Sequence, residues 1–107
     1  MRVHNELGQG FLESVYSEAL EKEFIKEYIP YDKEKKITVI YDGQQLNKFF
    51  KAEFVCFDSI ILELKSTSFF TDADWVQSFN YLKATRFKLA LLVNFGTPKL
   101  IYKRIAN

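Results

Sequence analysis

Residues 60–65 read Ile-Ile-Leu-Glu-Leu-Lys, an apolar run that closes with an acid and a base. On a β-strand, side chains two positions apart point to the same face, so Glu63 and Lys65 project together. Charged groups at the end of a core strand are costly to desolvate unless they pair or bind a ligand. Taken alone, the residue types favour a surface charge pair, Glu63 with Lys65 and Glu53 with Lys51, over a site. The rest of the chain decides between these two interpretations.

The segment before this run predicts a three-stranded meander. Residues 37–41 are typical of a strand, and Asp42-Gly43 is a strong signal for a two-residue hairpin turn. The strand after this turn is then expected to continue through residues 49–56. A short loop at residues 57–59 leads into the Ile-Ile-Leu-Glu-Leu-Lys strand.

The length of that loop decides which acids face each other. A three-residue loop sets Glu53 opposite Glu63 and Lys51 opposite Lys65, whereas a two-residue loop sets Glu53 against Leu64. Because leucine is an unfavourable partner for a carboxylate, we expect the three-residue loop. The sequence therefore predicts two carboxylates side by side at the end of the meander.

The remaining pattern predicts two helices and two further strands. The helices are expected at residues 11–27 and 71–86, and the strands at 89–93 and 100–105. Thr71 suits the N-cap of the second helix, and Asp74 completes a capping box. The run at 89–93 is apolar throughout, which is typical of a strand buried on both faces. The order helix, three strands, helix, strand, strand predicts an α/β fold with a mixed sheet.

Length and composition predict one domain over residues 1–107. No apolar stretch is long enough to cross a membrane and no signal-peptide pattern is present, so we expect a cytoplasmic location without membrane contact. One cysteine and one histidine provide neither a disulfide framework nor the ligands typical of zinc.

Charge is unevenly distributed along the chain. The last acidic residue is Asp74, and the charged residues beyond it are Lys83, Arg86, Lys88, Lys99, Lys103 and Arg104. A basic end beside an acidic middle is typical of a phosphate-binding surface near a metal site. It is equally typical of a solvated charged face.

The pair Glu53 and Glu63 suggests a metal site. Two facing carboxylates repel each other unless a cation lies between them, and Mg²⁺ prefers such hard oxygen donors. An ion there can activate water and neutralise a phosphate, while Lys65 can orient the water or stabilise negative oxygens. Gln77 and Tyr81, one helical turn apart, can contact the substrate or position the water. Taken alone, these two are more typical of the polar margin of a packed helix.

Short motifs along nearly the whole chain resemble the GxxExxY protein family. The pattern that names the family fits Gly10-Phe11-Leu12-Glu13-Ser14-Val15-Tyr16. The match continues in order through residues 4–8, 51–54, 61–65, 77–85 and 91–96. A lone Glu-x-Lys is a weak signal, whereas this ordered series is specific.

The GxxExxY family is assigned to the PD-(D/E)xK nuclease-like superfamily. The resemblance therefore implies a restriction-endonuclease-like core of order αβββαβ, and Mg²⁺ or Mn²⁺ as cofactor. It places Glu53 and Glu63 at the two metal-ligand acids and Lys65 at the catalytic lysine. Glu13 matches an acid on the first helix of some exonuclease branches.

The resemblance extends to the second helix, with departures. Gln77 and Tyr81 match the Gln-x-x-x-Tyr element of the same branches. Asp74-Trp75 stands where the family often has His-Glu, and Glu53 stands where aspartate is usual. The family also has a longer helical lead-in, so we expect that either the first helix is truncated here or the start codon is assigned late.

Three functions follow from these observations. The first is a Mg²⁺-dependent nuclease acting on DNA or RNA, whose substrate contacts are expected from Gln77, Tyr81, Lys83 and Arg86. The second is a catalytically inactive nuclease-fold module that binds nucleic acid in a salt-dependent way or contacts another protein. The third is a partner subunit or homodimer that associates through exposed aromatic side chains. The candidates for that surface are Phe69, Phe70, Trp75 and Phe95.

Overall fold

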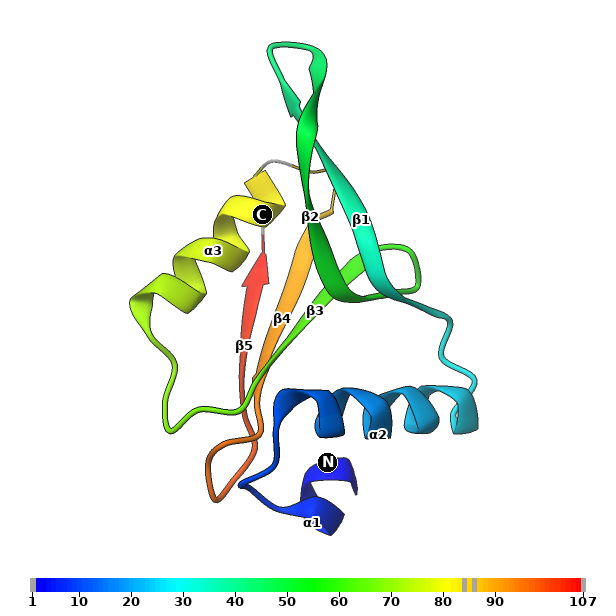
Figure 1. The fold of residues 1–107 in the computed structure, drawn as a ribbon, viewed down its shortest axis with the longest axis vertical. Coiled ribbons are helices and arrows are strands. Elements are labelled where there is room, and N and C mark those ends of the chain that lie inside the picture. The colour runs from blue at the N-terminus through cyan, green and yellow to red at the C-terminus, as the bar shows by residue number, and fades with distance from the viewer. Residues whose placement is uncertain (1, 84, 86, 107) are drawn as a thin grey trace.

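A five-stranded mixed sheet forms the centre of the molecule, which a computed structural model describes over residues 2–83, 85 and 87–106 (Figure 1). The strands are β1 (Tyr31–Tyr41), β2 (Gln44–Cys56), β3 (Ile60–Lys65), β4 (Leu89–Asn94) and β5 (Ile101–Ala106). They lie side by side in the order β1-β2-β3-β4-β5. Neighbouring strands are antiparallel except β3 and β4, which are parallel. The predicted α/β fold with a mixed sheet is confirmed.

Helices cover both faces of this sheet: α1 (Arg2–Leu7), α2 (Glu13–Lys26) and α3 (Asp72–Lys83). Leu62 and Leu64 of β3 join the core beneath α1 and α2, whereas Ile61 joins the core beneath α3. Because adjacent strand residues point to opposite faces, α2 and α3 lie on opposite sides of the sheet. Among the described residues, no helix is long and apolar enough to span a bilayer.

The start of α3 has the predicted capping box. The N–H of Asp74 donates to Thr71 Oγ1 at 3.1 Å, and the N–H of Thr71 donates to Asp74 Oδ2 at 3.0 Å. The predicted helix ran to Arg86, which lies outside the described residues, and α3 ends at Lys83. The helix connects β3 to β4, which is the crossover that a parallel pair of strands requires.

The turn between β2 and β3 has the predicted length. Residues 57–59 form it, and Phe54 pairs with Leu62. Continued by one residue beyond the last paired position, this register sets Glu53 opposite Glu63. The three-residue loop is therefore confirmed.

Strands β1 and β2 extend past the rest of the sheet as a two-stranded arm, here residues 35–51 (Figure 1). β2 pairs with β1 along most of its length but with β3 only over residues 54–56. The strand predicted at 37–41 was too short, because β1 begins at Tyr31, whereas the strand predicted to continue after the turn through residues 49–56 agrees with β2. Charged residues at 32–36 hide the strand signal in the first half of β1, because this segment is largely exposed.

The residues that fit the GxxExxY pattern hold the turn between α1 and α2. Tyr16 is fully buried, and its hydroxyl donates to the Gly8 carbonyl at 2.6 Å and accepts the Phe11 N–H at 3.3 Å. Gly8 and Gly10 have φ of 68° and 106°, a region that favours glycine. The Tyr16 ring stacks on Phe95, with centroids 4.5 Å apart. Phe95 is therefore buried, and its predicted place on an exposed aromatic surface was wrong.

Candidate active site

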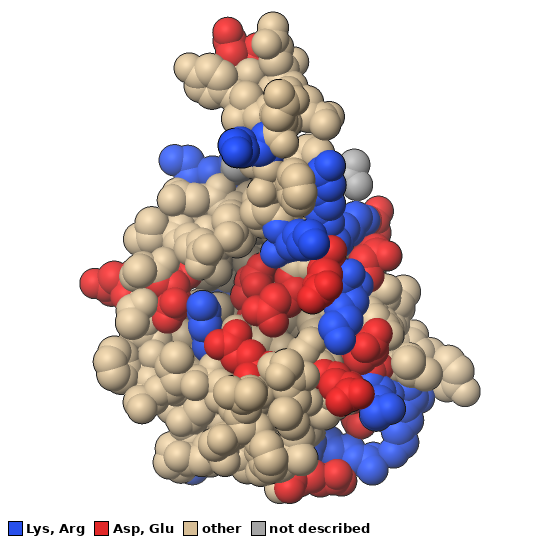
Figure 2. All heavy atoms as spheres, in the orientation of Figure 1, with Lys and Arg blue, Asp and Glu red and all other residues tan. Residues whose placement is uncertain are grey.

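A cavity of about 270 Å³ lies between β2, β3 and α3, and we call it the carboxylate cavity. Its lining includes Glu53 from β2, Glu63 and Lys65 from β3, and Gln77 and Tyr81 from α3. Lys51, Asp74, Ser78 and Leu92 complete the lining. Figure 2 shows a hollow on one face of the molecule where acidic and basic side chains meet. The fold thus brings together five residues that the sequence singled out.

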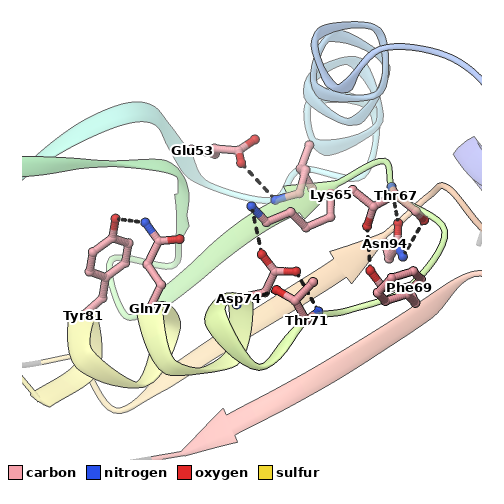
Figure 3. A network of polar contacts seen from close by, with 10 residues as sticks. Glu53, Lys65, Thr67, Phe69, Thr71, Asp74, Gln77, Tyr81 and Asn94 are labelled. Atoms are coloured by element: carbon pink, nitrogen blue, oxygen red, sulfur yellow. Dashed lines mark hydrogen bonds and ion pairs between the residues drawn. The ribbon is translucent and has the colours of Figure 1, made fainter.

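Glu53 lies where β2 stops pairing with β3. Its Oε1 accepts the N–H of Leu64 at 3.1 Å, so the carboxylate takes the position of a further backbone bond between the two strands (Figure 3). Burial raises the pKa of Glu53, and the Leu64 N–H opposes that rise. The negative charge of Glu13 raises the pKa further.

The Glu63 carboxyl group has one oxygen without a hydrogen-bond partner among the described residues and a raised pKa. Its Oε1 is buried and has no hydrogen-bond partner among the described residues. Burial raises the pKa of Glu63 to about 8, and the negative charge of Glu53 adds to the rise. A hydrogen bond from the protonated Glu63 carboxyl to Glu53 acts in the same direction. At neutral pH the metal-free pair therefore holds a proton between two carboxyl groups.

These two carboxyl groups fit a divalent cation. A cation would replace the shared proton, cancel the repulsion and provide a partner for the orphaned Glu63 oxygen. Mg²⁺ accepts hard oxygen ligands and usually keeps several waters, so one or two carboxylates suffice to hold it. Among the described residues, no cluster of three or more His, Cys, Asp or Glu side chains could hold a metal. Glu53 and Glu63 are the candidate ligands because their carboxyl groups interact and one Glu63 oxygen has no partner among the described residues.

Lys65 is paired with an acid that sequence reasoning did not assign to the site. Its Nζ lies 3.4 Å from Oδ1 of Asp74, whose other oxygen caps α3 (Figure 3). The Thr71 N–H and, to a smaller extent, Lys65 lower the pKa of Asp74. In the described chain, no ion pair within 4.0 Å joins Glu63 to Lys65 or Glu53 to Lys51, so the surface charge-pair interpretation was wrong.

The helical spacing in the sequence could have placed Asp74 in the site. Asp74, Gln77 and Tyr81 are spaced three and four residues apart, so they share one stripe of α3. Gln77 Nε2 donates to the Tyr81 hydroxyl at 2.7 Å. The Tyr81 ring in turn stacks on Phe50 of the arm, with centroids 3.8 Å apart and planes 7° from parallel. This stripe faces the carboxylate cavity.

Comparison with known proteins gives the family. The family model of the PD-(D/E)XK nuclease superfamily matches residues 1–105. This chain belongs to that superfamily. The predicted restriction-endonuclease-like core agrees with this assignment and is confirmed by the observed order of helices and strands.

A solved structure has a similar fold. The crystal structure of SSO0001 superposes with a TM-score of 0.63 and 15% sequence identity, over 88% of this chain and 50% of that one. The chain thus spans half the length of SSO0001. At this identity the likeness concerns the fold alone. No curated protein matches the chain.

Two other predicted site residues, Glu13 and Lys83, are not part of the lining of the carboxylate cavity. Glu13 is exposed at the first position of α2 and acts on Glu53 through its charge. Lys83 is exposed and lines a different cavity, near β1. Arg86 lies outside the described residues. The role of each stays a prediction.

The aromatic residues predicted for a homodimer surface are exposed to different degrees. Phe69 is 67% exposed and Trp75 is 40% exposed. Trp75 stacks on Phe79, with centroids 5.2 Å apart. Phe70 is half-buried.

Proposed function

We propose that this PD-(D/E)XK domain is a nuclease that hydrolyses phosphodiester bonds of DNA or RNA with Mg²⁺ or Mn²⁺ held by Glu53 and Glu63. The observation that carries the proposal is the buried, partnerless oxygen of Glu63 beside a second carboxyl group. When bound, a divalent ion supplies Lewis-acid catalysis for the attack of water on a phosphodiester. Membership of a nuclease superfamily supports nucleic acid as the substrate.

Lys65 supplies positive charge for the phosphate. Asp74 ties the Lys65 ammonium to the start of α3, so the charge is fixed at the wall of the carboxylate cavity before substrate arrives. A pre-positioned cation stabilises the negative charge that develops on the phosphate oxygens in the transition state. Removal of Asp74 would leave a mobile lysine in the same cavity.

Gln77 and Tyr81 orient the substrate. Because Gln77 donates to the Tyr81 oxygen, the Tyr81 hydroxyl hydrogen is left to donate to a phosphate oxygen. The stack on Phe50 restrains the Tyr81 ring, so that donor is held in place. Such positioning lowers the entropic part of the barrier.

The glutamate at the first ligand position is compatible with this function. Its side chain is longer than the usual aspartate, but the bond from the Leu64 N–H to Glu53 Oε1 holds the carboxylate against β3. Glu53 therefore lies beside Glu63 rather than extending into solvent. Its second oxygen, Oε2, is the expected ligand atom.

The test compares Glu63→Gln with Glu18→Gln, which makes the same chemical change on the exposed face of α2. Labelled single strands and duplexes of DNA and RNA are incubated with Mg²⁺ or Mn²⁺, and cleavage is followed on denaturing gels. We expect Glu63→Gln to reduce cleavage by at least about 100-fold, the scale of losing one preorganised electrostatic group. Glu18→Gln should cleave like the unmodified protein, and EDTA should abolish cleavage. Wild-type rates in Glu63→Gln would refute the proposal.

A nucleic-acid-binding module without cleavage is the second candidate. It is favoured by the Lys65–Asp74 ion pair, which satisfies the lysine charge within the protein. This candidate predicts nucleic-acid binding that needs no metal, and no cleavage with either ion. Calorimetric titration with Mg²⁺ distinguishes the nuclease from the binding module. Only the nuclease predicts that the unmodified protein binds Mg²⁺ and that this heat of binding is absent in Glu63→Gln.

A further inference from the structure

A second cavity, of about 610 Å³, lies between the edge strand β1 and the segment that follows α3, and we call it the basic cavity. Its polar lining consists of Lys35, Lys36, Thr38, Lys83 and Thr85. The part of the chain that the structure describes contributes no acid to this lining. The basic cavity therefore offers ammonium and hydroxyl groups to an anion.

Two of its lysines carry charge that the described protein does not neutralise. Lys35 forms ion pairs with two carboxylates, but Lys36 and Lys83 have none within 4.0 Å among the described residues. The Lys36 ammonium lies 4.3 Å from the centre of the Phe49 ring, and that of Lys83 lies 5.8 Å from the centre of the Phe79 ring. Aromatic faces stabilise a cation without cancelling its charge.

A pair of opposed lysines connects the two cavities. Lys36 of β1 is the direct cross-strand partner of Lys51 of β2. Lys36 lines the basic cavity and Lys51 lines the carboxylate cavity. Like charges directly opposite each other destabilise a sheet, so a bound anion would relieve the repulsion between these two lysines.

The arm also exposes rings and apolar side chains. Tyr41 is 72% exposed and Phe49 is 47% exposed. Residues 35–51 contain a single acid, Asp42, against four lysines. Figure 1 shows that the arm projects from the sheet, and a two-stranded hairpin of this kind is only marginally stable by itself in water. A polyanion with planar bases matches both the charge and the exposed rings of the arm.

We propose that the arm and the basic cavity bind an unpaired nucleic-acid strand and lead it into the carboxylate cavity. The inference rests on the nuclease function proposed above, which provides the reason for a strand at Glu53 and Glu63. Phosphates contact Lys36, Lys51 and Lys83, and a base stacks on Phe49. An unpaired strand fits this surface better than a duplex, because only splayed-out bases can stack on the exposed Phe49 ring.

The first experiment measures the salt dependence of binding. Fluorescently labelled single strands of DNA and of RNA are titrated with protein in EDTA, where cleavage is absent, and anisotropy is recorded at several KCl concentrations. We compare Lys36→Ala/Lys83→Ala with Lys22→Ala/Lys26→Ala, which removes the same charge from the exposed surface of α2, on the opposite face of the sheet. Loss of two phosphate contacts should lower the slope of log K against log salt by about 1.4, at about 0.7 per contact.

The outcomes separate this inference from the nuclease function. The control should keep the slope of the unmodified protein. Equal slopes for the Lys36/Lys83 variant and its control would overturn the proposal, while leaving metal-dependent cleavage untouched. Binding of neither single strand, or tighter binding of a duplex of the same sequence, would also overturn it.

A second variant tests the stacking contact. Phe49→Ala removes an exposed ring without removing charge, so it should weaken binding by about tenfold or more, the scale of one lost base–aromatic stack. The salt slope should stay that of the unmodified protein. Because Phe49 is half-exposed, thermal unfolding should confirm that the variant folds. If Phe49→Ala binds the single strand with unchanged affinity, the arm does not stack on the strand as proposed.

Discussion

Replacing Glu63 by glutamine is expected to stabilise the metal-free protein at neutral pH. In the native state, the Glu63 carboxyl is protonated and donates to Glu53 because burial raises its pKa to about 8. In the unfolded chain the same group has its ordinary pKa of 4.5. Glutamine has nearly the same shape, is neutral, and can donate to Glu53 through its amide. The glutamine side chain therefore resembles the protonated carboxyl group, but it does not lose a proton as pH rises.

The sign and size of the effect follow from these two pKa values. Between pH 4.5 and 8, unfolding releases the Glu63 proton, so the stability of the unmodified protein falls as pH rises through this window. At pH 7 the loss is about 3 kcal/mol, at about 1.36 kcal/mol per unit of pKa difference. Glu63→Gln does not have this loss of stability, because glutamine does not titrate. Its melting temperature at pH 7 should exceed that of the unmodified protein by roughly 10 °C or more.

The assay is urea unfolding in EDTA at pH 5, 6, 7 and 8. The two proteins should have similar free energies of unfolding near pH 5, where Glu63 is protonated in the native state, and the difference should grow toward pH 8. Glu18→Gln serves as the control on the exposed surface. Addition of Mg²⁺ at pH 7 should stabilise the unmodified protein and leave Glu63→Gln unchanged, because only the former gains a bound ion.

One result would refute the reasoning directly. If the difference in free energy of unfolding between Glu63→Gln and the unmodified protein is the same at pH 5 and pH 8, the carboxyl does not titrate within the window. The partnerless oxygen would then have a role unrelated to a shared proton. A destabilisation by Glu63→Gln at pH 5 that diminishes toward pH 8 would instead indicate an unfavourable fit of the amide added to the expected titration.

Three further predictions concern the site and the fold. Calorimetric titration with Mg²⁺ at pH 7, in buffers of different ionisation enthalpy, should show release of about 0.9 proton per ion, because a group of pKa about 8 is mostly protonated there; heats that do not vary with the buffer would contradict this. Tyr16→Phe should lower the free energy of unfolding by about 1–3 kcal/mol, since the buried hydroxyl bonds to two backbone groups, whereas the same change at the exposed Tyr102 should have little effect. Thr71→Ala should cost about 1 kcal/mol by removing the cap of α3, and a loss within the error of urea unfolding would argue against the capping box.

The sequence by itself determined the order of the elements and the register that matters for the site. Asp42-Gly43 specified the hairpin, and the preference of Glu53 for a polar partner over Leu64 specified the three-residue loop. These features are local, because turn chemistry and the two-residue period of a strand act over a few neighbouring residues. The capping box at Thr71 and Asp74 was predictable for the same reason.

Only the tertiary structure decided how the charges are paired. Glu63 and Lys65 share a strand face, but α3 packs across that face and brings Asp74 to the lysine, which leaves Glu63 buried beside Glu53. Likewise, Lys83 follows Tyr81 closely in sequence yet lines the basic cavity rather than the carboxylate cavity. Distances between residues of different elements depend on how helices pack on the sheet. That packing is a global balance of burial, which the periodicity of one segment does not encode.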